Sequence, residues 1–157
     1  MRYTPLILIA AGLLVSCEKS PFDPEKIIAL EKAALDRWGK GDPQGYLETY
    51  APDVTYFDPQ REKRADGIQA MKDYLAPLTG KIKVDHYEML DPKVQHVGDV
   101  AVLSYQLASH ATLPDGSPFT VRWNSTKVYG LFDGKWKLFH DHWSFIRPEL
   151  KNPPGVQ

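Results

Sequence analysis

The stretch Asp133-Gly-Lys-Trp-Lys-Leu-Phe-His-Asp-His-Trp-Ser144 narrows the choice of fold more than any other part of the sequence. Its first two residues, Asp133 and Gly134, form the pair that accepts positive φ in a two-residue hairpin turn. After the turn, bulky apolar side chains alternate with polar ones, which is typical of a strand. The stretch therefore predicts a long antiparallel hairpin, built from residues 119–132 and 135–145.

Strict alternation assigns the second strand of this hairpin to two faces: one with Trp136, Leu138, His140, His142 and Ser144, the other with Phe139, Asp141, Trp143 and Phe145. His140 and His142 could hold a metal ion, because imidazole binds zinc, copper and iron. Such a site needs further ligands, with His96 or His110 as candidates, and no carboxylate-rich or cysteine motif completes it. We predict no metal and no cofactor. The alternative for both histidines is a hydrogen-bonding role at a subunit interface.

The N-terminus indicates an exported protein. Arg2 precedes an apolar run over 6–15, which is too short to cross a bilayer and matches the apolar core of a signal peptide. Ser16-Cys17 follows and resembles the lipobox of bacterial lipoproteins, in which the cysteine is lipidated and the peptide is cut before it. Cys17 is the only cysteine, so no intrachain disulfide can form. The alternative is an ordinary secretory signal with a stray cysteine.

Four segments are expected along the chain: a signal peptide at 1–16, a tether at 17–23, one folded domain at 24–147 and a flexible tail at 148–157. Acyl chains on Cys17 would anchor the protein in the bacterial cell envelope, facing the periplasm. Glu18 follows the cysteine in place of an aspartate, which favours the outer membrane over the inner one. Nucleic-acid binding requires an excess of basic side chains, and the net charge here is −1, so nucleic acid is not an expected partner.

The folded domain is predicted to begin with helices and continue with strands. Asp23-Pro24 and Asp42-Pro43 each place an N-cap acceptor before a proline at the first helical position. An apolar stripe at helical spacing follows the first start: Ile27, Leu30, Ala34, Leu35 and Trp38. A short second helix ends before Pro52, then come a strand over 54–58, a third helix over 67–76, and strand-like runs over 81–90, 94–97 and 100–111. This order predicts an α+β fold, with a curved antiparallel sheet wrapped around three helices.

This order of elements, closing on Asp-Gly-Lys-Trp and His-x-His-Trp-Ser, resembles the nuclear transport factor 2 superfamily. Within it, the chain is similar to the SnoaL-like group and to the association domain of calcium/calmodulin-dependent kinase, over about residues 24–147. The resemblance implies a cone-shaped fold, a pocket between the helices and the concave sheet face, and a homodimer formed through the outer sheet face. It does not imply one function, because members include isomerases, cyclases, hydratases and scaffolds.

The same resemblance suggests which side chains line the pocket. In the kinase association domain, the positions that match Lys127 and Trp143 hold pocket arginines, which places Lys127, Asp141 and Trp143 on the concave side. His140 and His142 then face the dimer partner. Because Trp143 supplies an apolar ring where the relative has a cation, an anionic ligand is less well supported. The predicted pocket combines aromatic and charged side chains: Trp38, Tyr56, Asp58, Trp123, Lys127, Tyr129, Asp141 and Trp143.

Asp58-Pro59 looks like the strand end that carries the general base of ketosteroid isomerase. A carboxylate at the mouth of an apolar pocket has a raised pKa, which suits proton abstraction from carbon, and a tyrosine could donate to the developing oxyanion. That pattern also needs a second, protonated acid deep in the pocket, yet residues 100–111 and 117–132 contain no Asp or Glu. The alternative role for Asp58 is to cap the loop after its strand.

Three function classes remain. The favoured one is a lipid-anchored domain that binds a small organic ligand in an aromatic-lined pocket without turnover. The second is a proton-transfer enzyme of isomerase, cyclase or hydratase type, with Asp58 as the base and Lys127 or a tyrosine as the electrophile. The third is a homo-oligomeric accessory or scaffold domain. The first is favoured because a pocket is implied while no complete acid–base set can be assembled.

Overall fold

A computed structural model describes residues 22–147, which form three helices packed on one curved sheet. The helices are α1 (Pro24–Trp38), α2 (Gln44–Leu47) and α3 (Gly67–Leu75), and α3 continues into the 3-10 turn η1 (Ala76–Leu78). The strands are β1 (Tyr50–Phe57), β2 (Ala65–Asp66), β3 (His86–Val97), β4 (Val100–Thr112), β5 (Pro118–Phe132) and β6 (Lys135–Phe145). The predicted signal peptide, Cys17 and the predicted tail lie outside the described residues.

Helix α1 begins at the predicted N-cap. The Asp23 carboxylate accepts a hydrogen bond from the backbone N–H of Glu25 at 3.0 Å, and Pro24 occupies the first helical position, where its missing N–H costs nothing. One face of the helix is buried against the sheet: Ile27, Ile28, Glu31, Ala34 and Leu35. The buried face therefore includes a carboxylate among the apolar residues of the stripe.

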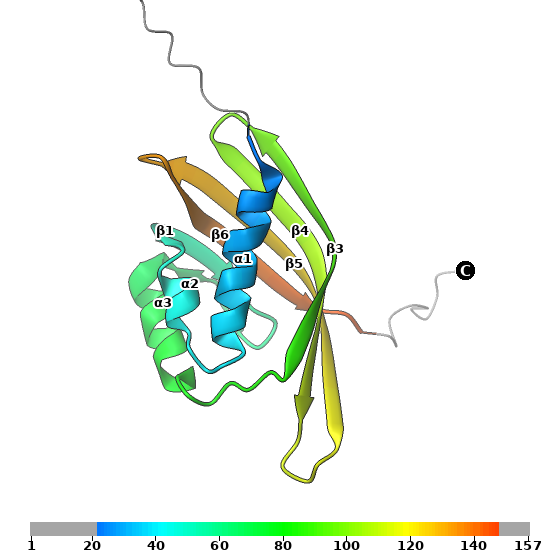
Figure 1. Cartoon of the computed structure of the whole chain (residues 1–157). Coiled ribbons are helices and arrows are strands. Elements are labelled where there is room, and N and C mark those ends of the chain that lie inside the picture. Colours follow the sequence, from blue (N-terminus) through cyan, green and yellow to red (C-terminus); the bar gives the residue numbers. More distant parts are fainter. Residues whose placement is uncertain (1–21, 148–157) are drawn as a thin grey trace, which may run out of the picture.

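The strands form one sheet in the order β2-β1-β6-β5-β4-β3, and the helices lie on one face of it (Figure 1). Strands β3 to β6 form an antiparallel meander, as predicted, whereas β1 runs parallel to β6. The predicted α+β class is thus confirmed. The parallel pair was not predicted. Strand β1 was expected to start at residue 54, after Pro52, whereas it begins at Tyr50, which pairs with Leu138 of β6.

Strand β3 replaces two shorter predicted runs. Its pairing with β4 continues from His86 to Val97 across a register shift between Leu90 and Lys93. Asp91 has a φ of 48°, in the left-handed region that aspartate tolerates better than most residues. Asp91 and Pro92 therefore form an irregularity inside one strand and do not separate two strands.

Strand β6 contains a bulge that simple alternation does not anticipate. Val128 pairs with His140 and Tyr129 with Leu138, so Phe139 is an extra residue in β6. The bulge shifts the alternation by one position, so that Leu138 and Asp141 are both fully buried on the helix side of the sheet. The prediction that Leu138 shares the face of His140, and Phe139 the face of Asp141, was wrong for this reason.

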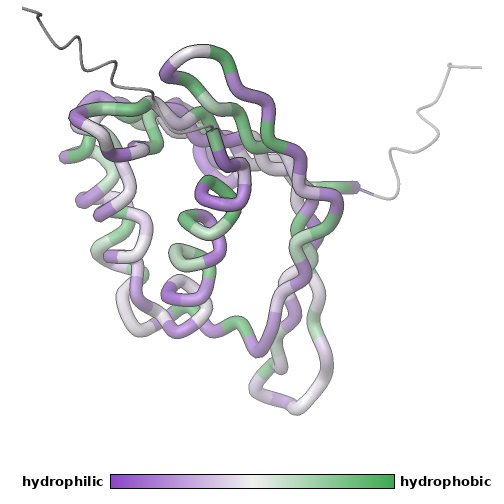
Figure 2. Tube along the Cα trace, turned by 45° about the horizontal axis from the view of Figure 1, so that its top comes forward, coloured by the Kyte–Doolittle hydropathy of each residue, from purple (hydrophilic) through white to green (hydrophobic). Residues whose placement is uncertain are grey.

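The fold in Figure 2 shows the helices as one layer and the sheet as another, with the β4–β5 hairpin extending beyond the helices. Each helix and long strand carries hydrophilic as well as hydrophobic residues, as expected for elements with one face on a core. Within residues 22–147, none of the helices combines the length and hydropathy needed to cross a membrane.

Candidate functional site

A cavity of about 870 Å³ lies between the helices and the concave face of the sheet. Its walls come from the three helices and η1, from the segment 81–84, and from strands β1, β3, β4, β5 and β6. Most of the lining is aromatic or aliphatic, and two carboxyls, Asp58 and Asp141, are part of it. The size suits a small organic molecule, and such cavities typically have mainly apolar walls with a few fixed polar groups.

Six of the eight predicted pocket residues line this cavity: Trp38, Tyr56, Asp58, Trp123, Asp141 and Trp143. Lys127 and Tyr129 do not line it. Both side chains are almost entirely buried, and they reach the cavity only through the groups that they contact. The cavity wall therefore consists mainly of aromatic and aliphatic side chains, with Asp58 and the fully buried Asp141 among them and the lysine behind Asp141.

Asp141 provides the buried polar group of the cavity wall. Its Oδ1 atom lies 2.7 Å from Lys127 Nζ, and its Oδ2 atom accepts a hydrogen bond of 2.9 Å from the Tyr50 hydroxyl. Burial raises the pKa of Asp141, and the Lys127 ammonium opposes that rise by favouring the charged carboxylate. A carboxyl with both oxygens fixed in this way is held in one orientation towards the cavity.

Glu31 of α1 forms the second half of the same polar cluster. Its carboxylate accepts hydrogen bonds from three tyrosine hydroxyls, those of Tyr46 at 2.8 Å, Tyr105 at 2.5 Å and Tyr129 at 3.0 Å. Lys127 Nζ lies 3.4 Å from Glu31 Oε1. Sequence reasoning missed this residue, although Glu31 lies four positions after Ile27 and four before Leu35, on the stripe that was predicted to be buried.

Lys127 lies at the centre of the cluster and is completely buried. Besides the two carboxylates, its Nζ lies 4.2 Å from the ring centre of Trp143 and 4.8 Å from that of Tyr46. Aromatic faces stabilise a desolvated ammonium group, and the carboxylates compensate its charge. The lysine thereby links the α1 carboxylate to the β6 carboxyl through β5.

The tyrosines of the cluster remain neutral donors. Burial raises the pKa of Tyr46, Tyr50, Tyr105 and Tyr129 well above the ordinary phenol value, and the neighbouring carboxylates raise it further. With one ammonium group facing two carboxyls, protonation of Asp141 would leave the cluster without net charge. Its raised pKa makes Asp141 the carboxyl that takes such a proton more readily than an exposed aspartate does.

Asp58 lies at the end of β1 and also lines the cavity. Its Oδ2 atom accepts a hydrogen bond of 2.6 Å from the Tyr56 hydroxyl, and its Oδ1 atom accepts one of 2.7 Å from the backbone N–H of Gln60. The second contact is the capping interaction considered as the alternative role for this residue. Burial, and next the charge of Asp58, raises the pKa of Tyr74 to about 12.

His140 and His142 lie on the opposite side of the sheet from Asp141. His140 Nδ1 is 2.8 Å from Thr55 Oγ1, and both imidazole rings contact Phe57. Burial, and then the neighbouring His142, lowers the pKa of His140, which keeps that ring neutral near pH 7. His96 stacks on Phe22 and His110 on His86, so each of the two suggested additional ligands is paired with a ring elsewhere.

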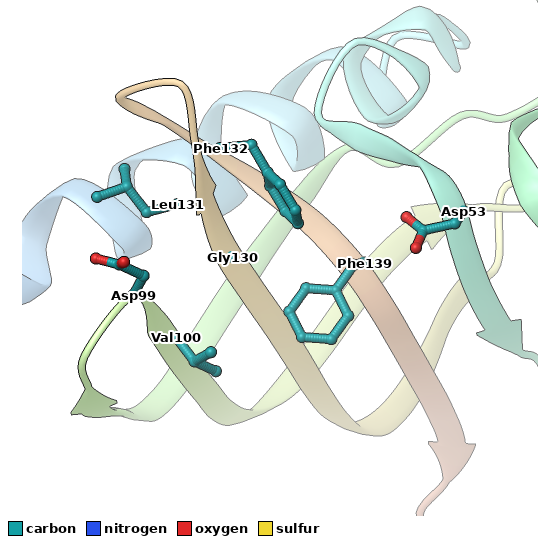
Figure 3. Close-up of a pocket in the computed structure, with 7 residues that line it drawn as sticks. All are labelled: Asp53, Asp99, Val100, Gly130, Leu131, Phe132 and Phe139. Carbon is teal, nitrogen blue, oxygen red and sulfur yellow. The ribbon is translucent and has the colours of Figure 1, made fainter.

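A second, smaller hollow of about 360 Å³ lies on the outer face of the sheet, with α1 behind the strands in Figure 3. Phe132 and Phe139 meet edge to face there, with ring centres 6.5 Å apart. A Cβ atom on Gly130 would lie 2.6 Å from the Phe132 ring, so the glycine leaves room for this aromatic pair. The lining joins apolar side chains to two carboxylates: Asp53, Asp99, Val100, Gly130, Leu131, Phe132 and Phe139.

Residues 24–146 match the model of the calcium/calmodulin dependent protein kinase II association domain. The chain belongs to this family. This chain is 28% identical over 135 residues to the delta subunit of rabbit (Oryctolagus cuniculus) calcium/calmodulin-dependent protein kinase type II. The alignment covers 84% of this chain and 25% of the kinase, so the chain spans about a quarter of that relative's length.

Solved structures extend the comparison beyond kinases. A candidate ketosteroid isomerase from Parabacteroides distasonis is 35% identical to this chain. The two structures align with a TM-score of 0.68, and the alignment covers 80% of this chain and 89% of that one. An NTF2-like protein of unknown function from Pseudomonas putida has the same fold at 21% identity, with a TM-score of 0.67 over 76% and 84% of the two chains. The resemblance to the kinase association domain is therefore confirmed, and the predicted NTF2-like fold is confirmed as a fold.

Two positions of this association domain, 127 and 143, were expected from the resemblance to match pocket arginines. Here they are a lysine and a tryptophan in contact with each other. Because Lys127 faces both Asp141 and Glu31, its charge is compensated inside the protein. The part of the cavity near Trp143 therefore presents an aromatic face and a carboxyl to a ligand.

Proposed function

We propose that this association domain binds a small, largely apolar organic molecule in the cavity between the helices and the sheet. The observation that carries the proposal is the fixed Asp141 carboxyl on the wall of an aromatic-lined cavity of about 870 Å³. Aromatic and aliphatic walls stabilise an apolar ligand by removing its surface from water. One fixed polar group then orients the ligand.

The polar groups suggest the chemistry of the ligand. Asp141 can accept a hydrogen bond when charged and donate one when protonated, so it suits a hydroxyl or carbonyl group at the inner end of the ligand. The side chains of Lys81 and Lys83 are exposed at the mouth and favour an acidic group at the outer end. The proposed ligand class is an aromatic or alicyclic acid that carries a carbonyl or hydroxyl group.

Anilinonaphthalene sulfonate is a suitable probe, because it joins an aromatic body to an acidic group and fluoresces when it leaves water. We expect saturable binding with one probe molecule per chain. Ala111→Trp would place a large ring in the cavity, where Ala111 lines the wall, and should remove the signal. Ala111→Ser is the matched control and should retain it.

The outer hollow provides the second control, since it also presents phenylalanine rings. Phe132→Ala removes an aromatic side chain from that hollow and leaves the cavity lining intact. Probe binding that survives Ala111→Trp and disappears in Phe132→Ala would overturn the proposal. The same pair of variants can then be screened by thermal shift with a panel of aromatic and alicyclic acids.

A second function, proton transfer on such a ligand, is favoured by one arrangement. Two carboxyls, Asp58 and Asp141, line the same cavity, and Asp141 is completely buried, which raises its pKa. Asp141 is thus a second acid contributed by β6, beyond the strands in which sequence analysis sought one. Among the similar structures, the candidate ketosteroid isomerase points to the same chemistry. Asp58 would take the proton from carbon and Asp141 would donate to the developing oxyanion.

Isomerisation of a β,γ-unsaturated cyclic ketone, followed by absorbance of the conjugated product, tests this second function. Asp58→Asn should remove the activity while leaving probe binding intact, because the amide keeps the side-chain shape and loses the base. Turnover that is unchanged in Asp58→Asn, or absent in the wild type while the probe binds, would exclude the catalytic proposal and leave the binding proposal standing.

We also propose that the domain assembles with copies of itself and is held at a membrane through Cys17. The family to which it belongs is named for association, and the outer hollow supplies an apolar surface for a second copy. Lipidation of Cys17 rests on the lipobox resemblance. Together, the two proposals describe a homo-oligomer held at the periplasmic side of the bacterial envelope.

A further inference from the structure

Three side chains with metal-binding atoms meet on the outer face of the sheet, at the end of the β3–β4 pair that is farther from the β3–β4 turn. His86 and Glu88 are two positions apart on β3, so they share a face, and His110 lies directly opposite His86 on β4. One nitrogen or oxygen atom of each residue lies within 4.8 Å of those of the other two. Strand register, not sequence proximity, brings the three together.

His110 is oriented by a neighbour on the next strand. Its Nδ1 atom lies 3.0 Å from Thr120 Oγ1, and Thr120 is its direct partner on β5. Its Nε2 atom is buried and makes no hydrogen bond within residues 22–147. When Nδ1 carries the proton and donates to Thr120, Nε2 presents its lone pair, which is the arrangement that prepares a histidine to bind a metal.

The other two side chains are accessible and lie against this nitrogen. The His86 ring is exposed and parallel to the His110 ring, with centres 4.3 Å apart and planes 6° apart. The Glu88 carboxylate is exposed and makes no hydrogen bond or ion pair with side chains of the described region. The three groups are on the opposite face of β4 from the cavity, so the ligand pocket does not use them.

We propose that His86, Glu88 and His110 bind one divalent ion of the zinc type. Two imidazoles and one carboxylate are a ligand set that zinc accepts, with metal–ligand distances of about 2.1 Å and ligand atoms about 3.4 Å apart in a tetrahedron. The ligand atoms now lie within 4.8 Å of one another. Because the two imidazole rings are parallel and their lone pairs lie in the ring planes, the exposed His86 ring must turn about its side-chain bonds to point at an ion held by His110. Calcium and magnesium prefer oxygen ligands, so they are excluded by the two imidazoles.

The proposed site differs from the His140/His142 metal site that the sequence suggested as a possibility. That hypothesis joined His140 and His142 of one strand to His96 or His110, whereas here His86 and His110 face each other on two strands and Glu88 lies two positions after His86 on β3. Three protein ligands leave a fourth position of a tetrahedral ion open. Water or a side chain of another molecule would complete the coordination, so the ion would be accessible from solution.

Isothermal titration of the full-length protein without an affinity tag, using zinc chloride alone, tests the proposal. We expect one zinc ion per chain, binding that His110→Ala removes, and binding that Glu88→Gln weakens. Thr120→Val should weaken zinc binding by about tenfold, the lower end of the usual effect of losing a group that orients a metal-bound histidine. Magnesium in large excess should not compete.

His142→Ala is the matched control, because it removes an exposed histidine from the same face of the sheet at a different strand. It should leave the stoichiometry at one ion per chain. Circular dichroism melts check that each variant is folded. Zinc binding that survives His110→Ala with unchanged affinity, disappears in His142→Ala, or is absent from the wild type would overturn the proposal.

Discussion

Lys127 is the residue on which the polar interior depends. A buried ammonium group is costly to remove from water, and the cost is offset only while its carboxylate partners and aromatic neighbours are in place. The two carboxylates depend on the lysine in turn, because each is also completely buried. Loss of Lys127 would therefore leave both buried carboxyls without a compensating positive charge.

Lys127→Met should lower the free energy of unfolding by about 3–5 kcal/mol, since methionine has a similar shape and leaves Glu31 and Asp141 as buried, uncompensated carboxylates. Urea denaturation at pH 7 measures the loss. The double variant Lys127→Met with Glu31→Gln should recover part of it, because one of the two negative charges is gone. A loss below about 1 kcal/mol, the value of an exposed ion pair, would contradict this account.

Asp141 gives stability a defined dependence on pH. Because burial raises its pKa in the folded state, the folded protein binds the proton more tightly than the unfolded chain does. Its contribution is therefore complete below the ordinary aspartate pKa of about 3.9 and declines as pH rises through the folded-state value.

Asp141→Asn removes this titration while keeping the shape of the side chain. The unfolding free energy of the wild type minus that of Asp141→Asn should therefore fall as pH rises from about 4 towards neutrality. Urea denaturation of both proteins at several pH values provides the measurement. A difference that grows with pH would show that the carboxylate is more stable in the folded protein than in the unfolded chain.

At the residue scale, resemblance and alternation were effective for the side chains that line the cavity. Asp141 and Trp143 lie on the cavity side, as expected, because both belong to the regular part of β6, where pairing with Lys127 and Ser125 of β5 fixes the inner face. Glu31 was missed because a carboxylate in an apolar stripe usually indicates the exposed edge of a helix. Its four partners come from α2, β4 and β5, which only the folded chain brings together.

At the scale of elements, the bulge in β6 decides which side chains reach the interior. Without the extra residue, Leu138 and Asp141 could not both face the helices, because three positions of regular strand lead to opposite faces. The bulge therefore lets β6 supply a core leucine near one end and the cavity carboxyl further along. Sequence alternation assumes a regular strand, so it assigned the residues after the bulge correctly and those before it incorrectly.

Deleting Phe139 tests the role of the bulge. The deletion would force β6 into regular alternation and turn either Leu138 or Asp141 outward, so we expect loss of cooperative thermal unfolding. Phe139→Ala keeps the backbone length and should retain a cooperative transition. Near-ultraviolet circular dichroism follows both proteins. A deletion variant that unfolds as cooperatively as Phe139→Ala would show that the bulge is dispensable.

The parallel contact between β1 and β6 also lay beyond sequence reasoning. Pro52 disfavours a central strand position, since proline cannot donate to a ladder of hydrogen bonds. The pairing avoids that cost because its register shifts between Tyr50 and Thr55, around the proline. The antiparallel meander was easier to predict, because its turns are marked by glycines and its strands are long.

At the scale of the whole molecule, the outer hollow is the proposed contact with a second copy. Phe132→Glu should reduce the mass measured by light scattering during size-exclusion chromatography, because a buried charge at an interface is costly. Phe119→Glu is a matched control: both phenylalanines are 49% exposed, but Phe119 lines the mouth of the cavity. A monomeric wild type, or an unchanged mass in Phe132→Glu, would contradict this interface.

The proposed membrane attachment rests on lipidation of the Cys17 sulfur. In a bacterial host, Cys17→Ser should move the protein from the membrane fraction to the soluble periplasmic fraction, because serine cannot receive the thioether-linked lipid. Immunoblots of separated fractions provide the measurement. A Cys17→Ser variant that still sediments with membranes would refute the lipoprotein assignment.

Helix α1 separates the start of the described chain from the opening of the cavity. At 15 residues it is about 22 Å long, with Phe22 before its first turn and the cavity residue Trp38 at its last. Phe22 is fixed at that far end by its stacking on His96. The start of the described chain and the cavity residue Trp38 therefore lie at opposite ends of α1, so Phe22 and its stacking partner do not stand in the path of a ligand that enters beside Trp38.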